Sequence, residues 1–142
     1  MEPLIALVVG FVGALLAGVA GVDALHGWQE ALRVGLALMF VVTGVSHFHP
    51  ATRGELVAMV PPRMPRPGLL VSVTGVLELA GAAGLLIPAT QRAAALCLTL
   101  LMLALFPANI SAARRRVAQG DPLGPRSLFQ LLYISAAVLT LV

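Results

Sequence analysis

Ionisable side chains inside apolar segments are the residues of this 142-residue chain that could do chemistry. Glu78 lies near the middle of an apolar run over residues 68–88. A charged acid at the centre of a membrane-spanning helix costs about 2.5–3.5 kcal/mol on insertion scales, so we expect Glu78 to face a bundle interior in its protonated form. Gly75 and Gly81 leave room beside it. Glu78 is therefore interpreted either as a proton-handling or ligand-binding group, or as a neutral acid that hydrogen-bonds two helices together.

Polar side chains at a similar depth in neighbouring segments support a shared site. Taken singly, each is typical of a satisfied polar group in a core. Taken together, they favour a polar cavity that opens toward the cytoplasm, although no catalytic residue is assigned. The candidate ligand-binding or proton-handling residues are Glu78, His47, Asn109, Gln130, Thr74 and Tyr133.

A metal site is not expected. His47 and His49 are two residues apart and point in different directions on a helix. Zinc sites need at least three protein ligands, and His26 is predicted on the opposite side of the membrane. Cys97 is the single cysteine, which excludes a disulfide within the chain.

The composition of the chain indicates an integral membrane protein. Apolar residue types make up 59% and charged types 11%, with a mean hydropathy of +0.98. Soluble domains carry about 25% charged residues, and disordered chains need low hydrophobicity. We predict an all-α membrane fold in a single domain over 1–142, in which spans two to five form a four-helix transmembrane bundle and the first span is an additional N-terminal transmembrane helix. The five spans are expected at about 4–22, 32–48, 68–88, 92–110 and 126–142.

The first apolar segment, 4–22, could instead be a signal peptide. Its start, Met1-Glu2-Pro3, is acidic where a signal peptide is basic, and its apolar run is long. A retained span is therefore favoured. Its small residues are predicted to share one helical face, which allows close helix packing in lipid; they are Gly10, Ala14, Ala17, Gly18 and Gly21.

Arginines predict the orientation of the chain in the membrane. The N-terminal side would hold seven of the nine arginines, and the opposite side only Arg33 and Arg92. Cytoplasmic loops are enriched in Lys and Arg, so we expect a multi-pass protein of the inner (plasma) membrane with a cytoplasmic N-terminus. Arg114, Arg115 and Arg116 are predicted to anchor the chain at lipid headgroups; a specific anionic ligand is the alternative.

The segment 49–67 is predicted to be an interfacial loop. Pro50 could begin a short helix lying in the interface plane, and the prolines between residues 61 and 67 forbid its continuation. The segment is interpreted either as a connector or as a lid over the cytoplasmic ends of the helices.

An ordered set of short motifs resembles a known family. The motifs are Gly44-x-x-His47-Phe48, Met59-Val60-Pro61-x-x-Met64-Pro65, the run Thr74 to Gly81 (TGVLELAG), Phe106-Pro107-Ala108-Asn109-Ile110, and Gln130. Over roughly residues 34–135 the chain resembles the DoxX-like family of small bacterial membrane proteins. The resemblance implies a compact four-helix membrane bundle, and span 4–22 is additional to that pattern. Some members resemble or accompany the membrane subunit of a thiosulfate:quinone oxidoreductase, and others are linked to redox-stress complexes.

Three functions stay open. A redox-linked, quinone-associated membrane subunit fits an apolar bundle in which an acid and an imidazole offer a proton route. A non-catalytic scaffold or assembly partner fits the small-residue face of the first span. A small-solute or proton carrier using Glu78 fits less well, because no inverted repeat is evident. The expected partners are the lipid bilayer, a quinone as the one cofactor considered, and another membrane or peripheral redox protein; nucleic acid is excluded because the chain lacks a basic surface large enough to bind it.

Overall fold

The chain is described by a computed structural model covering residues 2–117 and 123–141. Every regular element in these ranges is helical, and no strand occurs among them. The elements are α1 (Glu2–Val19), the short 3-10 helix η1 (Asp23–Leu25), α2 (Trp28–Ser46), α3 (Pro50–Met59), α4 (Pro67–Leu86), α5 (Gln91–Arg115) and α6 (Leu123–Leu139). The prediction of an all-α chain is confirmed.

Two prolines affect the helices in different ways: Pro50 begins a helix, and Pro107 lies within one. Pro50 is the first residue of α3, and the residue before it, His49, is extended (φ −73°, ψ 129°). A residue that precedes proline is driven out of the helical region, so no helix can run through His49 into α3. α2 ends before it, at Ser46. Pro107 lies inside α5 without ending it. The helix continues to Arg115, five residues past the end predicted for that span, because neighbouring groups can satisfy the carbonyl that proline leaves free.

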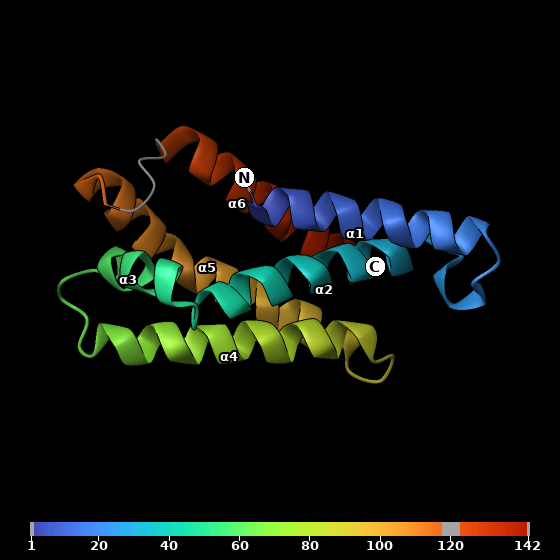
Figure 1. Ribbon diagram of the computed structural model, residues 1–142, viewed down its shortest axis with the longest axis horizontal. Helices are drawn as coiled ribbons and strands as arrows, with labels where there is room; N and C mark the ends of the chain where they lie inside the picture. The colour runs from blue at the N-terminus through green and yellow to red at the C-terminus, as the bar shows by residue number, and fades with distance from the viewer. Residues whose placement is uncertain (1, 118–122, 142) are drawn as a thin grey trace.

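Four helices pack in a ring, and the fifth long helix lies outside it. α2 packs against α4, α4 against α5, α5 against α6, and α6 returns to α2. α1 runs along the outer side of α2 (Figure 1). Leu36, Met39, Leu85 and Leu98 are the largest apolar side chains buried at the centre. α3 lies beyond the C-terminal end of α2, beside the first half of α4, and it also contacts α5 (Figure 1).

Glycines bring α1 and α2 into close contact. A Cβ atom on Gly10 would lie 2.8 Å from the Cα of Gly35, and a Cβ on Gly35 would lie 2.6 Å from the carbonyl oxygen of Leu7. Ala14 and Gly18 continue the buried face of α1. α2 of the same chain therefore covers this part of the small-residue face of α1, whereas Gly21 lies beyond the helix and is exposed.

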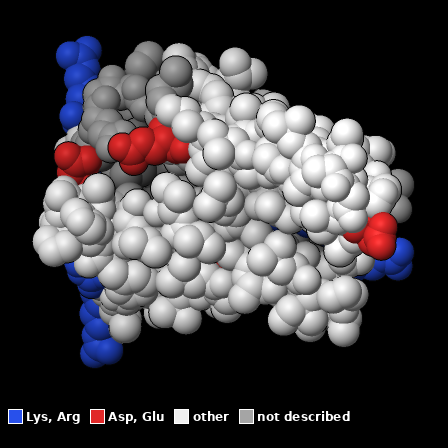
Figure 2. Space-filling model, turned by 45° about the vertical axis from the view of Figure 1, so that its right-hand side comes forward, with Lys and Arg blue, Asp and Glu red and all other residues white. Residues whose placement is uncertain are grey.

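The outer surface is apolar in the middle and charged toward the ends. α1, α2, α4 and α5 are long and apolar enough to cross a membrane, whereas the apolar part of α6, Ser127–Leu139, is shorter. Large apolar side chains such as Leu16, Val76 and Leu100 are exposed. Figure 2 shows the acidic and basic residues of one face gathered toward its two ends. Apolar surface of this extent on a monomer marks contact with lipid or protein.

Candidate functional site

Glu78 and His47 meet where α2 and α4 cross. The Oε2 atom of Glu78 lies 3.8 Å from the Nδ1 atom of His47. Both residues are buried, with 6% of Glu78 and 8% of His47 exposed. Oε2 has no hydrogen-bond partner among the residues that the structure describes. An unpaired buried oxygen costs about 1–3 kcal/mol, so its presence in a packed interface requires an explanation.

The hydrogen bond of His47 fixes the state of its ring. Nδ1 lies 2.8 Å from the backbone carbonyl oxygen of Thr43. A carbonyl only accepts, so Nδ1 carries a proton and donates it there. The second nitrogen, Nε2, is consequently the basic atom of the neutral ring. Nδ1 is also the ring atom that lies 3.8 Å from Oε2 of Glu78, so the carboxyl lies beside the side of the ring that is bonded to Thr43. The hydroxyl of Thr43 donates to the carbonyl oxygen of Phe40 in its own helix at 3.4 Å.

The early end of α2 brings His47 to the depth of Glu78. His47 is the residue that follows the last turn of α2. A Cβ on Gly75 would lie 2.6 Å from the Cβ of His47, which places His47 about eight residues, or roughly 12 Å, along α4 from its first residue. The sequence places His47 at a membrane surface and Glu78 in the middle of a span. In the structure the two side chains face one another across the α2–α4 contact.

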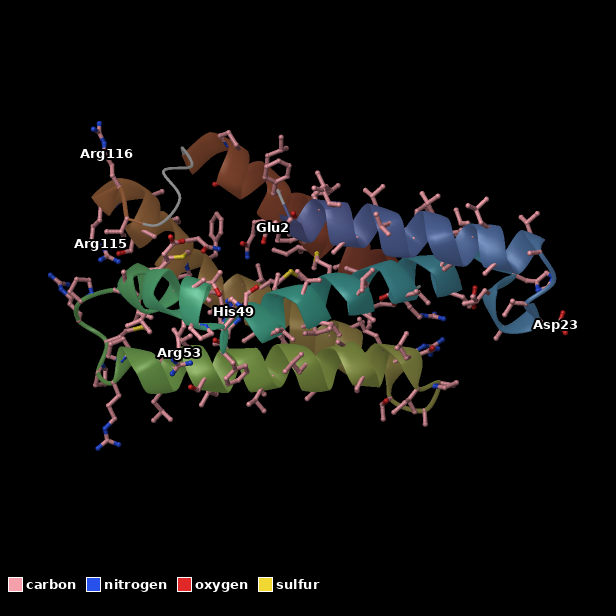
Figure 3. All side chains as sticks on the ribbon, viewed as in Figure 1. Glu2, Asp23, His49, Arg53, Arg115 and Arg116 are labelled. Carbon is pink, nitrogen blue, oxygen red and sulfur yellow. The ribbon has the colours of Figure 1, made fainter. Side chains whose placement is uncertain are left out.

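Arg53 closes the site from α3, a role that the sequence analysis does not assign. Its guanidinium donates to the carbonyl oxygen of His47 at 2.8 Å, to the carbonyl oxygen of Gly68 at 3.0 Å and to the hydroxyl of Ser72 at 2.9 Å. Figure 3 shows Arg53 between α3 and α4. The His47 carbonyl is one of the free acceptors at the end of α2, and the guanidinium satisfies it. Arg53 thereby connects α2, α3 and α4 next to the Glu78–His47 pair.

Asn109 and Gln130 form a separate pair between α5 and α6. Asn109 Nδ2 donates to Gln130 Oε1 at 2.8 Å, and Gln130 Nε2 donates to the carbonyl oxygen of Met102 at 2.6 Å. Pro107 lacks the N–H that would donate to the carbonyl oxygen of Leu103, the residue after Met102. Gln130 thus bonds to the backbone of α5 next to the carbonyl that the proline leaves free. This arrangement has a structural role, since both the oxygen and the nitrogen of the Gln130 amide are occupied by hydrogen bonds within the protein.

Loss of this amide pair is expected to cost a small amount of stability. Gln130→Leu removes both hydrogen bonds and should lower the free energy of unfolding in detergent micelles by about 0.6–1.7 kcal/mol, the range for bonds between helices in membranes. The check is a double-mutant cycle with Asn109→Leu. The double variant should cost less than the sum of the single variants, because the bond between the two residues is counted twice in that sum. Additive costs would contradict this pairing.

Thr74 and Tyr133 do not join either pair. The Thr74 hydroxyl donates to the carbonyl oxygens of Leu70 and Val71 in its own helix. Tyr133 packs against the apolar core, and its ring stacks on Phe129 at 6.5 Å between centroids. Of the six candidates, the structure thus pairs Glu78 with His47 and Asn109 with Gln130, on two different helix contacts.

The described residues bring together no group of three or more His, Cys, Asp or Glu side chains that could hold a metal ion. The surface formed by the described residues includes two hollows. One, of about 330 Å³, lies between α1 and α2 and is lined by Glu2 and apolar side chains. The other, of about 620 Å³, lies between α5 and the segment after α3, and its lining includes Arg114 and Arg115. Arg116 follows α5 with a left-handed backbone (φ 52°).

Comparison with known proteins places the chain in a family without assigning an activity. Neither the curated proteins nor the solved structures give a match. Residues 36–140 match the family described as "Domain of unknown function (DUF8561)". The matched range begins within α2 and includes its second half together with the whole of α3, α4, α5 and α6. The chain therefore belongs to the DUF8561 family.

Proposed function

We propose that this protein is a multi-pass membrane protein whose Glu78–His47 pair handles protons for a redox-linked, quinone-associated membrane subunit. One observation carries the proposal: a buried carboxyl oxygen without a hydrogen-bond partner lies 3.8 Å from an imidazole nitrogen. Ionisable groups inside a membrane bundle are costly and are retained where they move protons or contact a ligand. The resemblance to DoxX-like proteins supports the link to quinone chemistry.

In this proposal α2, α4, α5 and α6 form a four-helix transmembrane bundle, α1 is an additional N-terminal span, and the whole chain is one membrane domain. The N-terminus faces the cytoplasm, because the ends with most arginines then lie on the cytoplasmic side of the inner membrane. The long apolar helices and their exposed apolar side chains support this placement. α3 and the segment up to residue 66 then cover the cytoplasmic approach to Glu78.

The chemistry that the pair can supply is proton transfer. Reduction of a quinone to a quinol takes up two electrons and two protons. In the proposal the electrons come from another membrane or peripheral redox protein, and the protons pass through the Glu78–His47 pair. His47 Nδ1 stays bonded to Thr43, so the ring keeps its orientation while Nε2 exchanges a proton. The alternative, a non-catalytic scaffold or assembly partner, stays open, although α2 packs on the small-residue face of α1 at Gly10.

Quinone binding by the purified protein tests the proposal. We expect organic extracts of wild-type protein, purified in mild detergent, to contain quinone by mass spectrometry, and a short-chain ubiquinone to bind saturably. Glu78→Gln should reduce both signals. The control is Glu55→Gln, the same change at an exposed acid of α3. Extracts without quinone, together with no saturable binding of the short-chain ubiquinone, would overturn the quinone assignment.

A further inference from the structure

We infer that the hollow between α5 and the proline-rich segment after α3 is a binding site for the headgroup of an anionic phospholipid. The inference is independent of the Glu78–His47 pair. It starts from the lining of the hollow, which has a volume of about 620 Å³. The lining consists of Pro61, Pro62, Arg63, Pro107, Ile110, Ser111, Arg114 and Arg115.

The charges of the lining fit a phosphate group. Arg63 and Arg114 contribute two exposed guanidinium groups, and Arg115 adds a third positive charge; among the described residues, no acid lines the hollow. A guanidinium binds phosphate oxygens through two parallel hydrogen bonds, which gives geometric selectivity as well as charge. Basic pockets between helices at the cytoplasmic side of membrane proteins bind anionic lipid headgroups. The exposed side chains of Arg63 and Arg114 can reach such a headgroup without leaving the hollow.

The apolar part of the lining distinguishes a lipid from a small anion. Pro61 and Pro62 form one wall, and Pro107 and Ile110 on α5 form the other. A free phosphate ion gains nothing from these apolar walls, whereas the glycerol and acyl carbons of a phospholipid bury against them. The combination of exposed arginines and two apolar walls therefore matches a molecule with an anionic head and an apolar body.

Arg115 holds the two walls together. Its guanidinium donates to the carbonyl oxygens of Met59 and Val60 at 2.9 and 3.2 Å, and its Nε donates to the Ser111 hydroxyl at 3.2 Å. These bonds connect α5 to the end of α3 and fix the position of Pro61 and Pro62. Arg115 is thus a positioning residue, and Arg63 and Arg114 are the residues assigned to the headgroup.

Arg116 offers a matched control. It is exposed, next in sequence to Arg115, and absent from the lining of the hollow. Figure 3 shows Arg115 turned toward α3 and Arg116 extending away from the helices. A general attraction of basic residues to an anionic membrane would use Arg116 as much as Arg114, whereas a built site would not.

Native mass spectrometry of the full-length protein, released from detergent with added lipid, tests the inference. We expect wild-type protein to retain phosphatidylglycerol in preference to phosphatidylcholine with the same acyl chains. Arg63→Gln and Arg114→Gln should each weaken retention about fivefold, the effect of one arginine near an anionic lipid surface. Arg116→Gln should leave retention unchanged. Arg63 lies in the segment between α3 and α4, so its substitution keeps the test valid if a change in α5 disturbs the fold.

Three outcomes would overturn the inference. Equal losses in Arg116→Gln and Arg114→Gln would show general electrostatic attraction. Equal retention of phosphatidylcholine and phosphatidylglycerol would show that the site does not select for an anionic headgroup. Displacement of phosphatidylglycerol by inorganic phosphate at the same concentration would show a site for a free phosphate ion. None of these results depends on whether a quinone binds near Glu78.

Discussion

Gly75→Ala is expected to lower the free energy of unfolding by about 1–3 kcal/mol, the usual cost of overpacking a well-packed contact. The new Cβ would lie 2.6 Å from the Cβ of His47 and 2.8 Å from Cε2 of Phe48. The His47 Cβ is attached directly to the backbone, so it cannot move away unless the end of α2 moves with it. The substitution should therefore separate α2 from α4 at the site and weaken the contact between His47 and Glu78.

Two other glycines provide a graded control for this prediction. At Gly44 the new Cβ would lie 2.8 Å from Cγ and 2.9 Å from Cδ2 of Leu79, contacts that a rotamer change can relieve, and 3.3 Å from the carbonyl oxygen of Gly75. At Gly13 a Cβ would meet nothing within 4 Å, and alanine is the better helix former. Thermal unfolding in detergent should give the lowest Tm for Gly75→Ala, an intermediate Tm for Gly44→Ala, and a Tm for Gly13→Ala equal to or above that of wild type. Equal values for Gly13→Ala and Gly75→Ala would contradict the close contact.

The helical class of the chain could be predicted from sequence because it depends on composition and on segment length. Long apolar runs with few charges leave the backbone no partner in lipid except its own helix. The short helix after Pro50 is also predictable, since proline is suited to the first turn and its predecessor is not helical. The end of α5 is harder to predict, because Pro107 interrupts the pattern while Gln130, a residue of another helix, satisfies the nearby carbonyl of Met102.

The pairing within the candidate site could not be predicted from sequence, because it depends on where helices end relative to one another. Residue counting places His47 at a membrane surface and Glu78 in the middle of a span. The two meet because α2 stops early and crosses α4 at Gly75. The two polar pairs also lie on different helix contacts, which residue counting along the sequence does not reveal. Asn109 pairs with Gln130 on the other side of the ring, and it uses hydrogen-bonding groups that a shared cavity would need.

The roles of the two arginines that hold α3 in place could not be predicted from sequence either. Arg53 and Arg115 bond mainly to backbone carbonyl oxygens, which every residue carries and no motif reveals. Arg115 was predicted to anchor the chain at headgroups, and its guanidinium contacts the end of α3. These bonds bind α3 to α2, α4 and α5. If α3 acts as a lid over Glu78, opening it requires that the bonds of at least one of these arginines break first.

Substitution of Glu78 is expected to separate function from stability. Glu78→Gln keeps the shape of the side chain but cannot exchange a proton, so the fold should remain and proton handling should be lost. Glu78→Leu should leave the free energy of unfolding unchanged or raise it, because Oε2 lacks a partner to lose. His47 keeps its bond to Thr43 in either variant. A gain in stability with a loss of activity is the pattern of a functional group placed at a structural cost.

Infrared difference spectra recorded during a pH titration of protein in lipid nanodiscs measure the proton exchange directly. Wild-type protein should show a carboxylic acid C=O band from a carboxyl with few hydrogen bonds, and the band should shift in D₂O. It should disappear in Glu78→Gln and persist in Glu55→Gln. If Glu78 instead only binds helices together, Glu78→Gln should resemble wild type in stability, and Glu78→Leu should lose about 0.6–2 kcal/mol. That stability pattern, together with no band that depends on Glu78, would exclude Glu78 from proton transfer. His47 would then lack its acidic partner in the proposed proton route.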